Sequence, residues 1–327
     1  MKTRILTLFA IFFSLASVGY GQVTEAESKL RDVKTDSITG WKMGGVAAVN
    51  LSQTSLTNWA AGGQNSFAVN GMFSVFANYK AENTVWDNSL DMGYGLLKQG
   101  KNSDYMKTDD KSDFLSKYGK RAYHNFYYAA LLNLKTQMTV GKDYAKDTAK
   151  ISNFFAPAYI VGALGMDYKP NKYFSAFVAP VTGKITLVND QDLADAGAYG
   201  VDAAVFDEVT KVKIKDGANS KSEFGGYIRV IYTKSDFENE FMKNISFTTK
   251  IDLFSNYEHK PQNIDVSWET LVTMKVNKYI SVNLNTHLIY DDDIFIGIDD
   301  DGNGTIDRES KKVQFKEILG VGIAYKF

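Results

Sequence analysis

The sequence of 327 residues has no cysteine, only four prolines and only three histidines. Without cysteine there are no disulfides, no thiol nucleophile and no zinc–thiolate site, so stability has to come from packing or from a closed sheet. The histidines are His124, His259 and His287, and no nucleophile elbow, P-loop or HExxH helix accompanies them. We therefore expect a protein that is not an enzyme.

An excess of positive charge is also lacking. The 37 basic and 38 acidic residues give a formal net charge of -1. If Lys2 and Arg4 are removed with an N-terminal leader, 35 basic residues remain and the charge becomes -3. Nucleic-acid binding relies on basic patches and positive net charge, so this balance argues against nucleic acid as a partner.

Long apolar runs are missing except at the N-terminus. Lys2 and Arg4 precede an apolar stretch over residues 5–18, and small residues follow at Gly19 and Gly21. This layout predicts a secretory signal peptide over residues 1–21. The alternative, an uncleaved anchor, fits less well because about 14 apolar residues fall short of the roughly 20 that a spanning helix needs. Residues 22–39 are charged and are expected to form a short periplasmic N-terminal segment.

Alternation of apolar and polar residues is what the rest of the chain has in abundance. In residues 264–276 the even positions are mostly apolar, whereas the odd positions include Asp265, Ser267, Glu269, Thr273 and Lys275. A period of two indicates β-strands with one apolar and one polar face. The predicted strands span residues 40–52, 64–80, 83–98, 109–118, 121–140, 153–168, 172–188, 221–234, 242–257, 262–276, 279–290 and 312–327.

The connections between these strands alternate in length. Brief ones such as AEN at 81–83, YGKR at 118–121 and KPNK at 169–172 are interleaved with longer polar ones, the longest from Asn189 to about Ser220. Short turns at one end and long loops at the other are typical of barrels in the outer membrane, with apolar residues outward and polar residues inward. The sequence therefore predicts an all-β fold, a transmembrane antiparallel β-barrel of about 12 strands over residues 40–327, with periplasmic turns and extracellular loops.

The C-terminal stretch LGVGIAYKF supports this location in the cell outer membrane. Its apolar residues alternate up to the terminal aromatic residue, and it resembles the C-terminal strand of outer-membrane proteins, with Gly322, Tyr325 and Phe327 as the assembly signal. The partners implied are outer-membrane lipid and the barrel assembly machinery.

A wider set of motifs resembles an uncharacterised Bacteroidetes family of outer-membrane-like β-barrel proteins, classed as a domain of unknown function. The resemblance covers nearly the whole chain after the leader and implies fold and location but no activity. It is carried by GWKMGG at 40–45, NWAAGG at 58–63, YYAALLNLKTQ at 127–137, FAPAYI at 155–160 and VNDQDLADAGAYG at 188–200, and by DLFSNY, PQNIDVSWE, IYDDD and VQFKEILGVGIAYKF further on.

Charged residues of both signs are expected to face the barrel interior. The expected function is a narrow passive channel for small polar solutes, and the alternative is a closed structural or interaction barrel that uses its long extracellular loops. Both signs in one lumen suit a hydrated passage, but they also suit pairing across the barrel that plugs it. The candidate lumen-lining residues are Lys135, Arg229, Lys250, Asp252, Asp265, Glu269, Lys275 and His287.

One loop, DDDGNGTID, has a pattern that suits calcium. Oxygen ligands at alternating positions with a glycine at the turn resemble the start of an EF-hand loop, but Ser310 stands where a bidentate Glu is required. The loop is therefore either a calcium site or a solvated acidic loop, and no other cofactor is expected. The candidate ligands are Asp299, Asp301, Asn303, Thr305 and Asp307.

Overall fold

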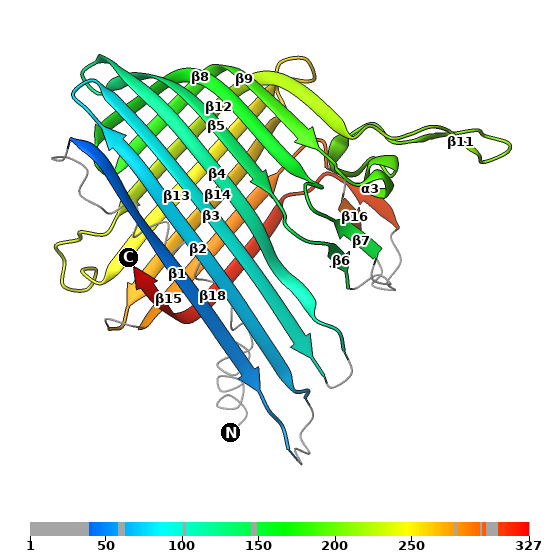
Figure 1. Ribbon diagram of the computed structural model, residues 1–327, viewed down its shortest axis with the longest axis horizontal. Helices are drawn as coiled ribbons and strands as arrows, with labels where there is room; N and C mark the ends of the chain where they lie inside the picture. The colour runs from blue at the N-terminus through cyan, green and yellow to red at the C-terminus, as the bar shows by residue number, and fades with distance from the viewer. Residues whose placement is uncertain are drawn as a thin grey trace, which may run out of the picture.

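The computed structural model describes residues 39–57, 63–100, 103–144, 149–277, 280–294, 296–298 and 307–326. Among these residues, twelve long strands form a closed antiparallel barrel (Figure 1). The barrel strands are β1 (Gly40–Thr54), β2 (Ser66–Lys80), β3 (Thr84–Gln99), β4 (Met106–Tyr123), β5 (Phe126–Thr136), β8 (Ala158–Asn171), β9 (Phe174–Leu187), β12 (Ser220–Lys234), β13 (Ile245–Asn256), β14 (Ile264–Lys275), β15 (Ile280–Tyr290) and β18 (Gln314–Lys326). Each predicted strand corresponds to one of these twelve, but several bounds differ: β4 extends beyond the predicted 109–118, and β5 is shorter than the predicted 121–140.

Strands that follow one another around the barrel are paired in sequence order, and β18 returns to β1. The ladder between β1 and β2 covers both strands from Gly40 paired with Lys80 to Thr54 paired with Ser66. The ring is closed by a much shorter ladder, in which residues 46–49 of β1 pair with residues 323–326 of β18. Closure removes unpaired strand edges and satisfies the backbone hydrogen bonds that a membrane-spanning sheet has to make internally.

The barrel has a turn end and a loop end. The turn end holds the start of β1, the end of β18 and the turns after β2, β4, β8, β12 and β14; the loop end is opposite. Most turn-end connections are short, but the one between Lys234 and Ile245 is longer than alternation predicts. At the loop end, the connection from β3 to β4 is confined to residues 100–105 and is shorter than predicted.

One predicted turn is wrong. YGKR at 118–121 lies inside β4, and the reversal comes instead at His124, whose φ of 46° is in the left-handed region, and Asn125. This segment contains Gly119, where a Cβ would lie 2.9 Å from Cγ2 of Val85. The glycine therefore serves close packing inside the strand, a role that sequence alternation does not distinguish from a turn.

The outward face of the barrel is apolar and exposed. Large side chains such as Met43, Leu51 and Leu164 project from it, as alternate positions along the strands require. Near the turn end an aromatic belt crosses β1 to β4. Ring centroids are 5.4 Å apart for Trp41 and Tyr79, 5.6 Å apart for Trp41 and Trp86, and 6.5 Å apart for Trp86 and Tyr118. An apolar outer wall bordered by aromatic residues is the exterior of a β-barrel of the outer membrane.

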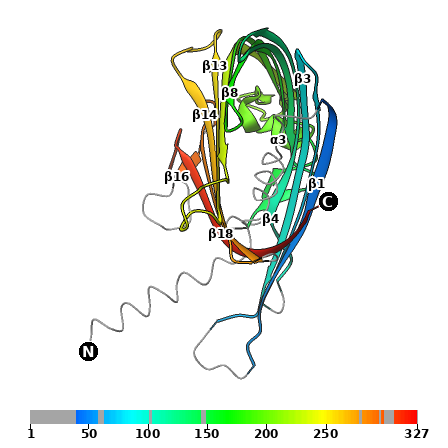
Figure 2. The ribbon, with the colours of Figure 1, turned by 90° about the vertical axis from the view of Figure 1, so that its left-hand side faces the viewer.

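The loop end carries further elements. Three hairpins lie there, β6 (Gly141–Asp143) with β7 (Ala149–Ser152), β10 (Val205–Phe206) with β11 (Lys213–Lys215), and β16 (Ile296–Ile298) with β17 (Arg308–Ser310). The short helix α3 (Gln191–Asp195) and the 3₁₀ turn η1 (Ala198–Gly200) lie between β9 and β10. Figure 1 places α3 at the loop end, and Figure 2 shows it within the outline of the barrel. No helix among the described residues is long and apolar enough to cross a bilayer.

The segment 188–201 is held firmly over the loop end. Asp190 caps α3 by accepting from the Leu193 amide at 3.3 Å, and its carboxylate lies 2.7 Å from Nζ of Lys150 and 2.7 Å from Nδ2 of Asn153. A small apolar cluster packs beneath, formed by Ala156, Val188, Leu193, Ala194 and Val201. The long connection from Asn189 is therefore an ordered part of the barrel mouth.

Candidate functional site

The barrel interior is crossed at mid-height by a set of buried polar side chains, here called the central layer. Their exposed fractions are only 4–7%, although most are charged. Alternation along β4, β5, β12, β13 and β14 points all of them inward. The central layer consists of Asp113, Asn133, Arg229, Lys250, Asp252 and Glu269.

Asp252 is the first of two charge centres in this layer. It accepts a hydrogen bond from the Tyr227 hydroxyl at 2.5 Å and lies 3.3 Å from Nη1 of Arg229. Nζ of Lys135 lies 3.7 Å from its other oxygen. A buried carboxylate with two cations and a hydroxyl around it is compensated, which is the condition for tolerating charge in a desolvated interior.

Glu269 is the second centre. Nζ of Lys250 lies 3.2 Å from it, and Nζ of Lys111 and Nε2 of His287 each lie 3.8 Å from it. The His287 ring is also 3.0 Å from Oγ of Ser267 on the neighbouring strand. The Ser267 hydroxyl is within hydrogen-bond reach of the ring, but the nearby Glu269 carboxylate approaches the same nitrogen, Nε2, so it does not orient the ring through Nδ1 as the third group of a catalytic triad does.

Two of these ion pairs bridge the lumen. Lys135 on β5 reaches Asp252 on β13, and Lys111 on β4 reaches Glu269 on β14. In the order of strands around the barrel, β5 and β13 are separated by three strands and β4 and β14 by five. Figure 2 shows that the barrel is flattened in cross-section, with β13 and β14 facing β3 and β4. The flattening brings opposite walls within reach of lysine side chains.

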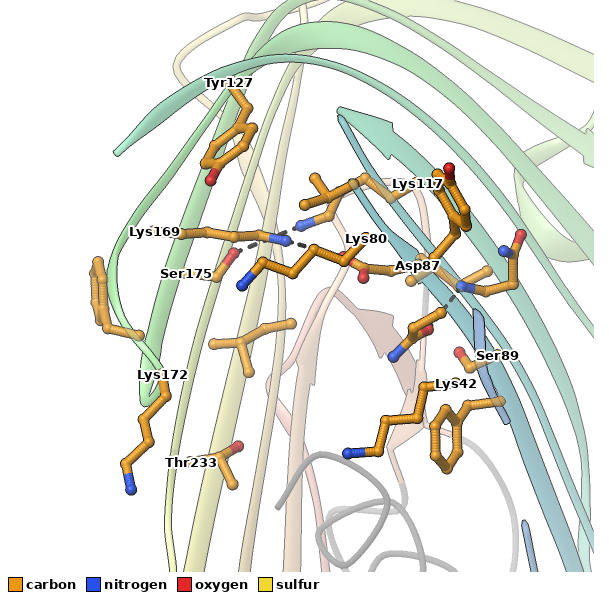
Figure 3. Close-up of a pocket in the computed structure, with 18 of the residues that line it drawn as sticks. Lys42, Lys80, Asp87, Ser89, Lys117, Tyr127, Lys169, Lys172, Ser175 and Thr233 are labelled. Carbon is orange, nitrogen blue, oxygen red and sulfur yellow. Dashed lines mark hydrogen bonds and ion pairs between the residues drawn. The ribbon is translucent and has the colours of Figure 1, made fainter. Parts of the chain in front are cut away.

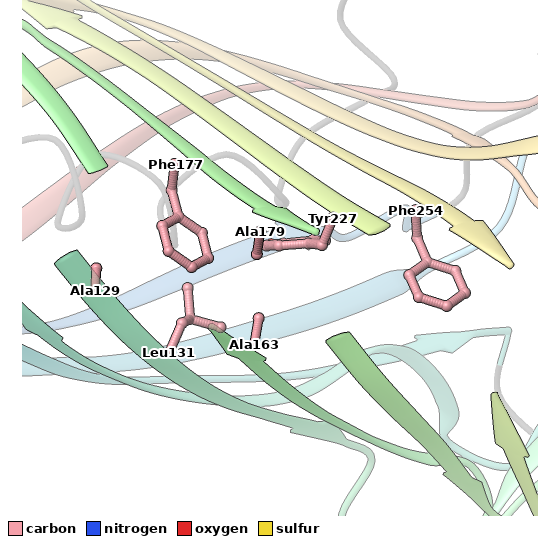
Figure 4. Packing of buried hydrophobic residues seen from close by; sticks show 7 residues of the cluster. All are labelled: Ala129, Leu131, Ala163, Phe177, Ala179, Tyr227 and Phe254. Carbon is pink, nitrogen blue, oxygen red and sulfur yellow. The ribbon is translucent and has the colours of Figure 1, made fainter. Parts of the chain in front are cut away.

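An apolar cluster fills the lumen beside the charges (Figure 4). Phe177 is completely buried, and its ring centroid lies 6.3 Å from that of Tyr227. The cluster consists of Ala129, Leu131, Ala163, Phe177, Ala179, Tyr227 and Phe254. Tyr227 joins this cluster to the central layer, because its ring packs with Phe177 while its hydroxyl donates to Asp252. In the described part of the wall, side chains therefore fill the middle of the barrel.

A cavity lies on each side of the central layer. The turn-side cavity has a volume of about 510 Å³ and the loop-side cavity about 560 Å³. The loop-side cavity is lined by Tyr199 from η1 as well as by the wall, so the segment over the barrel mouth forms part of it. In its wall Lys184 lies 2.9 Å from Asp265 and 3.4 Å from Glu223.

Loop groups at this mouth have shifted pKa values. Hydrogen bonds from Lys213 at 2.6 Å, the Gly217 amide at 2.8 Å and Gln191 at 2.6 Å lower the pKa of Asp195 to about 2. Burial raises the pKa of Tyr199 to about 12. At neutral pH the mouth therefore holds an ionised Asp195 and a protonated Tyr199.

The predicted site residues fall into three places. Lys135, Asp252, Asp265, Glu269 and His287 line the loop-side cavity. Arg229 and Lys250 lie in the central layer. Lys275 lies outside both the loop-side cavity and the central layer. It is exposed at the turn end of β14, where the strand ends.

The remaining predicted residues are at or outside the edge of the described chain. Gly322 and Tyr325 lie in β18, where they pair with β15 and β1 respectively, and Phe327 lies outside the described residues, as does the signal peptide over 1–21. Of the calcium-loop residues, Asp299, Asp301, Asn303 and Thr305 also lie outside, and Asp307 is exposed. Within the described ranges, no group of three or more histidine or carboxylate residues is placed to hold a metal.

Several residues of the site were missed by sequence reasoning. Lys111 and Asp113 lie within a predicted strand, and their inward parity was the available signal. Lys184 and Tyr227 had the same signal in their strands. Which cation faces which carboxylate across the lumen had no local signal, because the partners are far apart in sequence.

Comparison with known proteins gives a matching family model and matching solved structures. A family model described as a protein of unknown function (DUF3078) matches residues 51–141, a segment that includes Asp113 and Asn133 of the central layer. No curated protein matches the chain. Among solved structures, the chain is similar to an outer membrane channel from Pseudomonas putida F1, with a TM-score of 0.40 and 8% identity over 90% of this chain and 98% of that one. It is also similar to the translocator domain of the autotransporter NalP from Neisseria meningitidis, with a TM-score of 0.37 and 12% identity over 95% and 100% of the two chains.

Proposed function

We propose that this outer-membrane barrel is closed at mid-height and works through its loop end, as a binding or interaction protein without enzymatic activity. The observation that carries the proposal is the central layer, in which cation–carboxylate pairs join opposite walls. Its partners are outer-membrane lipid, the assembly machinery that recognises its last strand, and a molecule contacted by the extracellular loops. The Bacteroidetes source implied by the sequence motifs belongs to the same proposal.

The energetics of the central layer favour closure. Separating a desolvated ion pair exposes each charge to an environment where its counter-charge is missing, which typically costs several kcal/mol. The fully buried Phe177 adds an apolar contact that solute passage has to break. Movement of a solute therefore requires the walls or the side chains to rearrange.

A narrow passive channel for small polar solutes is the second candidate. It is favoured by the two cavities that lie on either side of the central layer, both lined by charged residues. In this case the paired charges act as a constriction that opens transiently. Measuring the conductance of the refolded protein separates the two candidates.

The test is conductance of the refolded protein in a planar bilayer. Wild type is expected to stay electrically silent. The double variant Lys111→Ala/Glu269→Ala, which removes one bridge across the lumen, is expected to give discrete conductance steps. Lys213→Ala, which removes only loop pairs, with Asp195 and Asp216, is the matched control and is expected to stay silent. Heat-modifiable migration in gels checks that every variant has folded.

Reproducible steps from wild type that small polar solutes block would contradict closure and establish the channel. Silence of the double variant, with folding verified, would show that Lys111 and Glu269 are not what closes the lumen. Pull-down with cell-surface material before and after trimming of the loops then tests the loop end as the working surface.

A further inference from the structure

The ring closes over only part of the two strands that meet at its seam. Among the residues that the structure describes, the ladder between β1 and β18 joins residues 46–49 to residues 323–326 and does not continue toward the loop end. Nearer the loop end, residues 314–322 of β18 pair with β15 alone, and residues 50–54 of β1 pair with β2 alone. Figure 1 and Figure 2 both show the two strands diverging on this side of the ladder. These two stretches, here called the open seam, each have one edge without a partner strand.

Side chains of the open seam are exposed on both faces of the sheet. On β18 the inward-facing Gln314 and Lys316 are exposed, and so are the outward-facing Phe315 and Glu317. Leu51 on β1 is exposed as well. Backbone N–H and C=O groups are costly to leave unpaired against lipid chains, so water or polar groups have to reach these edges. The hydrated interior and the membrane therefore meet at the open seam.

The loop-side cavity lies directly behind the open seam, because Gln314 and Lys316 of β18 form part of its lining. The described residues that line it come from β4 around the barrel to β18 and from loops at the mouth, and none of them comes from β1, β2 or β3. The strand with the free edge therefore borders the cavity. Its volume of about 560 Å³ is within the range of about 300–1,000 Å³ that is usual for small-ligand pockets.

The lining of this cavity is partly apolar. Ile289 lies opposite Gln314 in the ladder between β15 and β18, so an apolar side chain is placed next to the open seam. A ligand that enters from this side meets apolar wall as well as charged groups, which suits an amphiphile. The apolar residues of the lining include Val161, Phe254, Val266, Ile289 and Ile294.

Lys316 is a cation without a counter-charge at the border of the cavity. It takes part in no hydrogen bond or ion pair with a described residue. Figure 3 shows the contrasting case in the turn-side cavity, where Nζ of Lys117 lies 2.7 Å from Asp167 and Nζ of Lys169 lies 2.9 Å from Asp87. Lysines held by carboxylates in this way add little to the attraction of an anion, whereas Lys316 is available to one.

Carboxylates also line the loop-side cavity, and several of them are held by cations, as Asp252 and Glu269 are in the central layer. Two others, Asp109 and Asp291, make no ion pair within the described ranges. An anion is therefore attracted to the wall around Lys316, beside the open seam, and not to the cavity as a whole.

We infer that a single-chain amphiphile with a carboxylate head group enters the loop-side cavity from the membrane through the open seam, which rests on the loop end being the working end as proposed above. The head group lies beside Lys316, whose ammonium group donates a charge-assisted hydrogen bond to it. The alkyl chain lies against the apolar lining and extends through the open seam to the lipid. Only the head group then leaves the membrane, so the chain keeps an apolar environment throughout.

Cysteine pairs test the open seam, because the chain has no cysteine of its own. Val49→Cys/Ile323→Cys changes two positions that are paired in the ladder, and it is expected to form a disulfide on mild oxidation. Leu51→Cys/Val321→Cys changes the next positions on the same face, and it is expected to stay reduced because Cα atoms more than about 7 Å apart cannot be bridged. Equal oxidation of both pairs would overturn the inference, since the strands would then be paired across the entry.

Binding is measured in phosphatidylcholine nanodiscs, because detergents are themselves amphiphiles. The probe is a fatty acid of twelve carbons with a photoreactive diazirine close to its carboxylate. Saturable labelling of β15 and β18 is expected, and dodecanoate is expected to compete at least about tenfold better than dodecyltrimethylammonium, which carries the opposite charge. Stronger competition by the cation would show that carboxylates such as Asp109 and Asp291 decide what binds, and would overturn the inference.

Lys316→Gln is expected to raise the half-saturating probe concentration about tenfold or more, since that is the order of a lost charge-assisted contact. Lys316→Arg keeps the charge and is expected to retain most of the affinity. Lys312→Gln is the matched control, because Lys312 is exposed before β18 begins and lies outside the lining of the cavity. Absence of saturable labelling in wild type, or an equal effect of Lys312→Gln, would overturn the inference.

Failure here is distinguishable from failure of the proposed function. Conductance by wild type would contradict closure at mid-height and would change neither the disulfide result nor the labelling result. Conversely, a silent barrel that takes up no fatty acid would leave closure intact and remove only this ligand and its route of entry.

Discussion

The ion pair between Arg229 and Asp252 provides a quantitative test of the closed interior. Both side chains are almost fully buried, and Asp252 holds the guanidinium at 3.3 Å. Arginine does not lose its proton in proteins, so Asp252→Asn leaves the Arg229 guanidinium buried and charged. Its remaining side-chain partner at this centre is the neutral Tyr227 hydroxyl, 3.3 Å away. Removing one member of a buried pair costs about 3–5 kcal/mol, and we expect this loss in the free energy of unfolding.

The assay is urea unfolding in lipid vesicles, followed by tryptophan fluorescence. Asp236→Asn serves as the control, because it removes the same group from an exposed pair, in which Lys172 and Asp236 are 38% and 45% exposed. Exposed pairs contribute about 0–1 kcal/mol, so the control is expected to unfold almost as wild type does. Replacing both members, as in Arg229→Met/Asp252→Leu, is expected to recover much of the stability, since the buried guanidinium is removed and Lys135, the other cation beside Asp252, is 28% exposed and can be hydrated.

A cost below about 1 kcal/mol for Asp252→Asn would refute the reasoning. That value is typical of a hydrated pair. It would mean that water reaches the centre of the barrel, and it would favour the channel over the closed barrel. A large cost for Asp236→Asn as well would point to a general effect of the charge change instead of burial.

Two further predictions concern strand packing and the barrel mouth. Gly165→Ala is expected to destabilise the barrel by about 1–3 kcal/mol in the same unfolding assay, because a Cβ there would lie 2.0 Å from the Val178 carbonyl oxygen. Gly162→Ala is the control and is expected to be tolerated, because a Cβ at Gly162 would have nothing within 4 Å. A lowered pKa means that ionised Asp195 stabilises the mouth fully above its unfolded value of about 3.9 and loses this effect as pH falls toward 2. Hydrogen exchange of the α3 amides, corrected for intrinsic rates, should therefore become faster in wild type as pH falls from about 3.9 toward 2. In Asp195→Asn it should not change over this pH range. Equal acceleration in both proteins would contradict this role of the carboxylate.

The fold was predictable because its signals are local. Alternation along a strand follows from the backbone geometry of the strand itself, so residues 264–276 could be assigned an apolar and a polar face from the sequence. Errors arose where one residue type has two roles. Gly119 can serve a turn or a close approach between strands, and only the position of Val85 shows which applies.

The site was predictable only in part. Parity along the strands placed Asp252 and Glu269 on the inward face, and the structure puts both in the central layer. Their bridging partners, Lys135 and Lys111, had the same inward parity, but no sequence signal joined β5 to β13 or β4 to β14. From the charged inward faces alone the sequence favoured a passive channel over a plugged barrel, because nothing in it indicated that these charges pair across the lumen.

The sequence by itself determined the strands, the apolar outer wall and the polar inner wall, because these depend on residues two positions apart. Only the tertiary structure decided how flat the barrel is, and the flattening brings lysines within 4 Å of carboxylates on the opposite wall. The same closure leaves a cavity on each side of the central layer. Contacts across a lumen depend on the distance between walls, which is a property of the closed ring and not of any single strand.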